Sequence, residues 1–184
     1  MMKISAGRPI KQGMETDSVD FAQLFPTLRG HSLTGYMALS IMTDNGLEEG
    51  TFLFKEGEII ALEYKYLAKE KIVTGEAALK LIMNACLGRG TFDVYELSEE
   101  EIIQTREDNR NTVLKYKPTN KELIELLPDS FTDITLEEKI AAAKTTAVDS
   151  ATSGKVSREA VLKKYGISHP DERMVDNLLK DVVK

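Results

Sequence analysis

The side chains that most often do chemistry are scarce in this chain of 184 residues, which has one cysteine, Cys86, and two histidines, His31 and His169. Cys86 lies in an apolar, helix-like stretch without a nearby base, and a thiol nucleophile needs activation by such a base or by a lowered pKa. A zinc site needs ligands in spaced pairs such as C-x-x-C, and the sequence has none. The 30 acidic residues offer many carboxylate pairs, but no spacing singles one out. The residues therefore predict no catalytic residue, no metal site and no cofactor.

Two short glycine-containing stretches resemble phosphate-binding loops in part. GRGTFD at Gly88 has the first two glycines of a dinucleotide fingerprint, but that motif needs a strand before it and a helix after it. Here the predicted order is reversed. SGKVS at Ser153 lacks both the upstream glycine and a Ser or Thr directly after the lysine. We interpret the first stretch as a helix end followed by a strand, and the second as linker.

The first predicted elements are a short helix and a strand. Asp17 or Ser18 is the expected N-cap of the helix. The i, i+3, i+4 and i+7 spacing of a helix face is met by Phe21, Leu24, Phe25 and Leu28. Pro26 is expected to kink or end this helix, because proline lacks the backbone N–H. Period-two alternation in LTGYMALSIMT then predicts a strand from about Thr34 to Thr43.

The most strongly patterned stretch is EGTFLFKEGEIIALEYKY, in which two runs of aromatic and β-branched residues meet at Gly57. It predicts a hairpin of strands Thr51–Lys55 and Glu58–Tyr64, preceded by a turn in TDNGLEEG. Glu56 and Gly57 fit a two-residue turn in which glycine takes positive φ. A three-residue turn with a bulge fits nearly as well and shifts the register by one residue. Because both hairpin faces are apolar, the pattern does not choose between the registers.

Both faces of this hairpin need a cover. With a two-residue turn, Phe52 and Phe54 are expected on one face and Leu53, Ile60 and Leu62 on the other. A sheet that is apolar on both sides must be covered twice. The second cover is either the helices expected within 120–147 or another protein chain, so we predict a homodimer or a complex with a signalling or regulatory protein. The predicted interaction surface comprises Leu53, Ile60, Leu62, Tyr64 and Tyr66.

The remaining elements of the predicted core are helices and one more strand. VTGEAALKLIMNACLGRG predicts a helix from Thr74 or Gly75 to Gly88, and GTFDVYEL predicts a strand that follows it directly. Capping boxes of the form S/T-x-x-E predict further helices at Ser98, Thr119 and Thr135. Four glycines are expected to serve the fold rather than a binding site: Gly35, Gly57, Gly88 and Gly90.

The C-terminal part has a different composition. Thr145–Lys155 is small and polar and is predicted to be a linker. Beyond it, two short helices around Gly166 are expected to form a hairpin that docks on a neighbour. Its predicted docking surface comprises Arg158, Lys163, Lys164 and Arg173. The hairpin resembles a DNA-reading helix pair, but acidic residues on its second helix would repel phosphate, so protein docking is favoured over nucleic-acid binding.

Composition narrows the class of protein. The net charge is −6 and the pI is about 5.1, which argues against a general nucleic-acid-binding protein. The N-terminus lacks the apolar core of a signal peptide, and no apolar run approaches the ~20 residues that span a bilayer. A single cysteine cannot form an internal disulfide and fits a reducing compartment. We predict a cytoplasmic protein that does not enter a membrane.

The order of the motifs LTGYMAL, EEGTFLFKEGEIIALEY, GEAALKLI and GRGTFDVYEL resembles that of an archaeal family of proteins of unknown function. Over about residues 20–97 it also resembles the bacterial PATAN (PatA N-terminal) domain. The matching positions are Gly50, Phe52, Phe54, Gly57, Ile59, Gly75, Ala78, Leu79, Gly90 and Phe92. The resemblance implies an archaeal source and a role in protein contacts within signalling systems, with no catalytic residue. The segment EYKYLAKEKIVT is longer than the usual PATAN connection.

Together these observations predict an α+β protein with a small antiparallel sheet of about four strands, packed with helices, and a C-terminal helical hairpin. The expected organisation is a PATAN-like domain over 1–130, a helix and flexible linker over 131–154, and the hairpin over 155–184. The expected function is that of a non-enzymatic regulatory or adaptor protein acting through protein–protein interaction. The alternatives are a nucleic-acid-binding or transcription-associated protein that uses the hairpin, or a small-molecule sensor with a pocket between helix and sheet.

Overall fold

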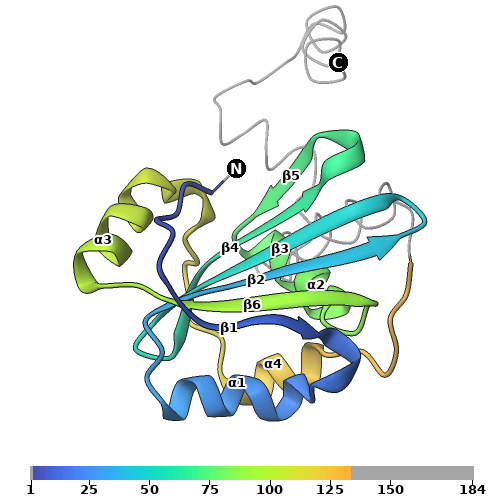
Figure 1. Cartoon of the computed structure of the whole chain (residues 1–184), viewed down its shortest axis with the longest axis horizontal. Coiled ribbons are helices and arrows are strands. Elements are labelled where there is room, and N and C mark those ends of the chain that lie inside the picture. Colours follow the sequence, from blue (N-terminus) through green and yellow to red (C-terminus); the bar gives the residue numbers. More distant parts are fainter. Residues whose placement is uncertain (1, 134–184) are drawn as a thin grey trace, which may run out of the picture. The chain divides into compact units, whose positions relative to one another are not determined.

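Six antiparallel strands form one sheet in the computed structural model, which describes residues 2–133 (Figure 1). The order of the strands across the sheet is β1-β6-β2-β3-β4-β5. Their bounds are β1 Arg8–Glu15, β2 Gly35–Thr43, β3 Gly46–Lys55, β4 Glu58–Tyr66, β5 Lys71–Thr74 and β6 Gly90–Glu96. The predicted α+β class is confirmed, and the predicted count of about four strands is corrected to six.

Helices pack on both faces of the sheet. Their bounds are α1 Phe21–Gly30, α2 Glu76–Ala85, α3 Glu99–Asp108 and α4 Asn120–Leu126. Three short 3₁₀ turns accompany them, η1 Thr16–Ser18, η2 Leu67–Lys69 and η3 Arg110–Thr112. Helices α1, α2 and α4 contribute to the large core on what we call the first face, and α3 contributes to a smaller core on the second face. No helix within residues 2–133 is long and apolar enough to cross a membrane.

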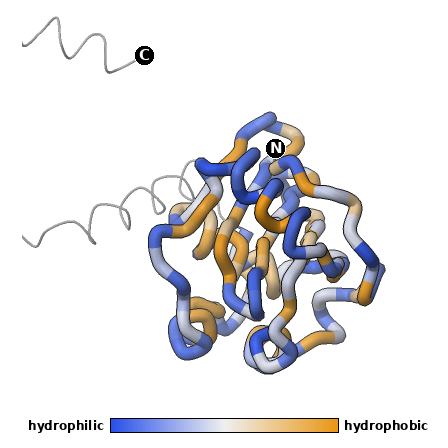
Figure 2. The backbone as a smooth tube through the Cα atoms, turned by 90° about the vertical axis from the view of Figure 1, so that its left-hand side faces the viewer, coloured by the Kyte–Doolittle hydropathy of each residue, from blue (hydrophilic) through white to orange (hydrophobic). Residues whose placement is uncertain are grey.

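Aromatic side chains join α1 to the first face. The ring centroids of Phe21 and Phe92 lie 5.4 Å apart, and those of Phe25 and Phe52 lie 5.5 Å apart. Such tilted pairs add about 0.5–1.5 kcal/mol to the free energy gained from burial alone. Figure 2 shows the hydrophobic stretches of the backbone gathered toward the middle of the described part and hydrophilic stretches in the outer loops. The first face is therefore the main core.

The first helix differs from its prediction at the N-cap, and of the two expected effects of Pro26, a kink or an end, the end does not occur. Its N-cap is Asp20, whose carboxylate accepts the N–H of Ala22, rather than Asp17 or Ser18. The helix also does not end at Pro26 but continues to Gly30. A proline inside a helix costs about 3 kcal/mol. Phe21 and Phe25 precede the proline on the same helix and are each 2% exposed. Their burial offsets that cost.

The hairpin of β3 and β4 has the two-residue turn, one of the two alternatives that the sequence left open, with Lys55 opposite Glu58. The register then shifts, because Phe54 pairs with Ile59 but Leu53 pairs with Ala61, which leaves Ile60 as an extra residue in a bulge. One extra residue moves every later β4 side chain to the other face. Leu62 therefore lies with Phe52 and Phe54 in the first-face core and not with Leu53. The predicted distribution of hairpin side chains is corrected accordingly.

Two strands were missed by the sequence patterns. Strand β1 contains Pro9 and Gly13, is almost wholly exposed, and pairs with β6 through two register shifts, so it has no apolar alternation. Strand β5 has only four residues and comes from the segment expected to be a long connection. Strand β3 begins at Gly46, so most of the predicted turn TDNGLEEG is strand. Edge strands are poorly patterned because they contribute little to the core.

The helix boundaries set by capping residues agree better with the structure. Ser98 and Glu101 form a complete capping box at α3, and Thr119 and Glu122 form one at α4. Helix α2 lies inside the predicted range and is followed by the predicted strand, now β6. The capping box at Thr135, the linker and the C-terminal hairpin lie outside the described residues, as does nearly all of the chain assigned to the second and third predicted segments.

Candidate functional site

The predicted interaction surface lies inside the protein. Leu53, Leu62, Tyr64 and Tyr66 are at most 2% exposed, and Ile60 is partly buried in the second-face core. Tyr64 and Tyr66 are joined to the first-face core because the β4 bulge turns them toward α2. While the fold is intact these side chains offer no surface to a partner, so a contact surface must be sought elsewhere on the molecule.

One end of the second face is covered by the chain itself. Met2, Leu97 and Ile102 pack on Leu53 and Ala61. Two buried side chains, Glu63 and Asn109, hold the N-terminal segment through hydrogen bonds to its backbone. The N–H of Met2 donates to Glu63 Oε1 at 2.7 Å. The N–H of Lys3 donates to Asn109 Oδ1 at 2.7 Å, and Asn109 Nδ2 donates back to the Lys3 carbonyl at 2.8 Å. This cover is α3 with residues 2–6, and the described part of the predicted covering helices, α4, packs on the first face instead.

The other end of the second face carries no such cover among residues 2–133. Figure 1 shows α3 at the left end of the strands and the β2–β3 turn at the right end. Four large apolar side chains are exposed around that right-hand part: Met42 at 64%, Leu47 at 38%, Leu67 at 40% and Ile72 at 46%. We call these four residues, with the sheet surface between them, the open half-face.

Pairing between strands explains how the open half-face is built. Met42 lies directly opposite Leu47, and Ile72 lies opposite Lys65, whose Nζ is 3.2 Å from Glu49 Oε2. Ser40 lies opposite Glu49, and Lys65 Nζ also lies 3.5 Å from Oε1 of the buried Glu63. The middle of the surface therefore holds a small hydroxyl and one lysine paired with two carboxylates. Exposed apolar side chains gathered among polar ones on one sheet surface have the composition of a protein contact surface.

The buried polar groups are structural. Glu48 is 1% exposed and accepts hydrogen bonds from the hydroxyls of Tyr64 and Thr43. Burial raises the pKa of the Tyr64 and Tyr66 hydroxyls above 10.0, so both are neutral at pH 7. Burial likewise raises the pKa of the fully buried Cys86 thiol, which keeps it protonated and inert. Within the described residues no His, Cys, Asp or Glu groups are arranged to hold a metal.

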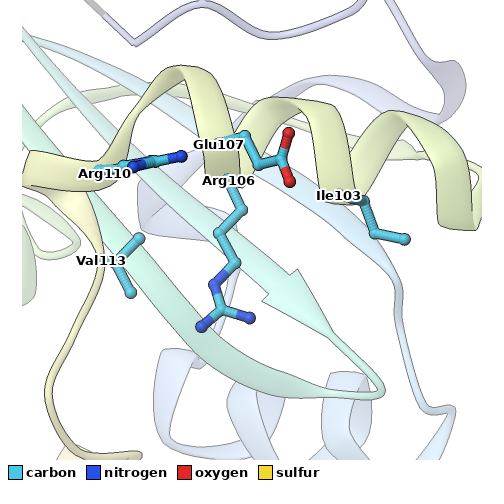
Figure 3. A pocket seen from close by; sticks show the side chains of 5 residues that line it. All are labelled: Ile103, Arg106, Glu107, Arg110 and Val113. Atoms are coloured by element: carbon cyan, nitrogen blue, oxygen red, sulfur yellow. The ribbon is translucent and has the colours of Figure 1, made fainter.

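A hollow lies beside α3 and η3. Its volume is about 350 Å³, and it is lined by Ile103, Arg106, Glu107, Arg110 and Val113 (Figure 3). Arg106 reaches down toward the strands, whereas the Glu107 carboxylate points away from it (Figure 3). Both arginines and the glutamate are exposed. Charges of opposite sign in open solvent define no particular ligand, so we assign none to this hollow.

The four predicted structural glycines lie at close approaches of the backbone. A Cβ atom on Gly35 would lie 1.9 Å from the Tyr95 carbonyl oxygen, and one on Gly90 would lie 2.0 Å from that of Ser40. At Gly88 the nearest atom, on Ile41, would be 2.9 Å away, and at Gly57 it would be the Cα atom of Arg29, 2.5 Å away. The other predicted docking residues, Arg158, Lys163, Lys164 and Arg173, lie outside the described part of the chain.

The open half-face was not predicted, because the predicted surface was placed on the most apolar residues of the hairpin, and these are buried. The available signal was the end of the strand pattern, where Met42 and Leu47 flank the turn at Asn45 and Gly46. Apolar residues on both sides of a polar turn are expected to pair across the strands. Within residues 2–133 neither side chain belongs to a core cluster, and this follows from the packing of α3 at the opposite end of the second face.

Comparison with known proteins adds the family to this picture. A protein from Archaeoglobus fulgidus, described as uncharacterized, is 27% identical over 182 residues, which is 99% of this chain. The chain spans 64% of the length of that relative. No solved structure matches the chain significantly. Residues 2–109 match the model of the family described as uncharacterized protein conserved in archaea (DUF2226). The chain therefore belongs to this archaeal family.

Proposed function

We propose that this protein is a non-enzymatic regulatory or adaptor protein, and that it binds a protein partner through the open half-face. The observation that carries the proposal is the exposure of Met42, Leu47, Leu67 and Ile72 around one part of the sheet. Exposed apolar patches with polar surroundings mark contact sites on soluble proteins. Within residues 2–133, the cysteine is inert and no metal cluster is present, which supports a binding role over a catalytic one.

The partner that the surface fits best is a second copy of the chain. In a two-fold dimer the same patch meets itself, so the patch must be self-complementary. The exposed apolar side chains satisfy this condition, since Met42 and Leu47 of one copy can pack on those of the other. A different signalling or regulatory protein is the alternative partner.

A relationship to the bacterial PATAN domain and a location in the cytoplasm are further parts of this proposal. The ordered glycines and aromatic residues of the β3–β4 hairpin, α2 and β6 support the relationship. PATAN-like domains act in protein contacts beside signalling modules, which agrees with an adaptor role. The single buried cysteine and the acidic composition support a reducing, cytoplasmic setting.

The double substitution Met42→Glu with Leu47→Glu is expected to abolish self-association. Placing two carboxylates at the centre of an apolar contact leaves them desolvated or repelling one another, so the dissociation constant of the dimer should rise at least tenfold. Size-exclusion chromatography with light scattering, over a concentration series of the full chain, measures this. Ile124→Glu is the matched control, because Ile124 is 43% exposed on α4 and lies on the first-face side of the sheet.

Two outcomes would contradict the proposal. A wild-type chain that is monomeric throughout, and that captures from a native lysate only proteins also captured by the double variant, leaves the open half-face without a role. Equal weakening of association by Ile124→Glu and by the double substitution would place the contact elsewhere. Circular dichroism of the three proteins checks that each remains folded.

A further inference from the structure

A cavity of about 560 Å³ lies between α1 and the edge of the sheet formed by β1 and β6. It is separate from the open half-face, because its floor is formed by Phe92 and Val94, which belong to the first-face core. Its wall on the helix side is formed by Leu24 and Leu28. These two leucines are only partly buried, whereas Phe21 and Phe25 of the same helix are 2% exposed.

The irregularity of β1 accounts for the cavity. Between Pro9 and Met14 the pairing with β6 shifts register twice, and Gly13 has φ of +64°. Bulges bend and twist a strand away from its neighbours. Helix α1 packs Phe21 against Phe92 and Phe25 against Phe52. The bent edge strand β1 does not pack closely against this helix. The space between them is therefore a consequence of how β1 pairs and is part of the fold.

The size and lining of this cavity are those of a site for a small molecule. Ligand sites in proteins span roughly 300–1,000 Å³ and are lined mostly by apolar side chains with a few polar groups. Close-packed protein interiors leave few voids larger than a water molecule. A cavity of this volume cannot accommodate a folded partner, and its apolar walls select an apolar chain or ring.

The polar residues that line the cavity are Lys11, His31, Ser32, Thr34 and Glu96, and among them Lys11 brings an ammonium group. Lys11 pairs directly with Val94, so both side chains project from the same face of the sheet, and Lys11 lines the cavity while remaining exposed. Lys11 makes no ion pair with the described residues, whereas Glu96, the carboxylate that also lines the cavity, is paired with Arg8. The net charge that faces a ligand at the rim is therefore positive.

We propose that the cavity binds an amphiphile with one apolar chain and a single anionic head group. The chain lies between the leucines of α1 and the floor at Phe92 and Val94, and the head group lies beside the Lys11 ammonium. This site is independent of the open half-face, and so of the proposed function, because the two share no residue. It adds a ligand-sensing role to the protein.

Sodium decanoate is the probe for this site, and isothermal titration calorimetry of the full chain is the measurement. We expect saturable binding of one decanoate per chain. Each methylene that enters the apolar part contributes about fourfold in the dissociation constant, so hexanoate, which has four methylenes fewer, should bind roughly 250-fold more weakly. Decanol, which lacks the charge, should bind about threefold more weakly than decanoate, and decyltrimethylammonium more weakly still.

Two substitutions locate the bound molecule. Lys11→Glu is expected to reverse the preference, so that decanol binds more tightly than decanoate. Leu24→Trp fills the cavity from the helix side and is expected to weaken decanoate binding at least tenfold. Ile124→Trp on α4 is the matched control and should leave decanoate binding unchanged, because its partly exposed side chain does not line the cavity.

Three results would overturn the proposal. Absence of saturable decanoate binding removes the site. Equal binding of decanoate, decanol and decyltrimethylammonium removes the anionic head group. Unchanged binding in Leu24→Trp, with loss in Ile124→Trp, places the molecule elsewhere. If Leu24→Trp fails to fold, the chain-length series and Lys11→Glu still decide the matter, because Lys11 is exposed and its replacement does not disturb the core.

Discussion

Gly57→Ala is expected to destabilise the protein by about 3 kcal/mol. Gly57 has φ of +78° in the β3–β4 turn, a conformation that costs an L-residue about 1–2 kcal/mol. In addition, a Cβ atom there would lie 2.5 Å from the Cα atom of Arg29 and 2.7 Å from its carbonyl oxygen. These are backbone atoms at the C-terminal end of α1, so the helix or the hairpin must move. Chemical denaturation with urea measures the change in the free energy of unfolding.

Gly13→Ala is the control that separates the cost of a positive φ from the cost of the close contact with Arg29. Gly13 has φ of +64°, close to that of Gly57, but nothing lies within 4 Å of a Cβ atom there. It should cost only the conformational part, about 1 kcal/mol. If both substitutions cost the same, the contact between the hairpin and α1 contributes nothing. The N–H of Gly57 also donates to the carbonyl of Leu33 at 2.8 Å, so the corner is held on two sides.

Alkaline pH is expected to unfold this protein steeply. Burial raises the pKa of Cys86 above 9.0 and the pKa values of Tyr64 and Tyr66 above 10.0. Each group is neutral in the folded protein, so its contribution to stability is fully present below the unfolded pKa and is lost as the pH rises past it. The free energy of unfolding should fall by roughly 3 kcal/mol between pH 10 and 11. Urea titrations at pH 8, 9, 10 and 11 measure this.

Single substitutions assign that loss to individual groups. Cys86→Ala removes the thiol that begins to titrate first, so the decline between pH 9 and 10 should become shallower. Tyr66→Phe should make the decline above pH 10 shallower and leave the interval below pH 9 unaffected. A free energy of unfolding that stays constant up to pH 11 in the wild type would show that these three groups are accessible to solvent in the folded state.

The parts of the fold that could be predicted are those in which a residue pattern fits a single local structure. The alternation of β2 from Gly35 to Thr43, the apolar face of α2 and the capping box at Ser98 each depend on local spacing or a local hydrogen bond. Such features survive any tertiary arrangement. The hairpin corner at Glu56 and Gly57 is of the same kind, whereas the two-residue length of the turn, in which both residues take positive φ, was decided only in the structure.

The candidate sites could not be predicted, because they depend on which surfaces of the sheet the helices and the edge strand leave exposed. A one-residue bulge at Ile60 sends Leu62, Tyr64 and Tyr66 into the first-face core, and a hairpin that is apolar on both faces gives no local sign of that bulge. The cavity beside α1 depends on the register shifts of β1, a strand whose sequence has neither alternation nor burial.

The amino-acid sequence by itself determined the α+β class, the hairpin corner at Gly57, the structural glycines and the scarcity of chemical side chains. The tertiary structure alone decided which face each side chain of β4 occupies, and that α3 with the N-terminal segment covers one end of the second face. It also left Met42 and Leu47 exposed at the other end. The physical reason is that local propensity acts over a few residues, whereas burial is settled by contacts between segments as distant as Met2 and Glu63.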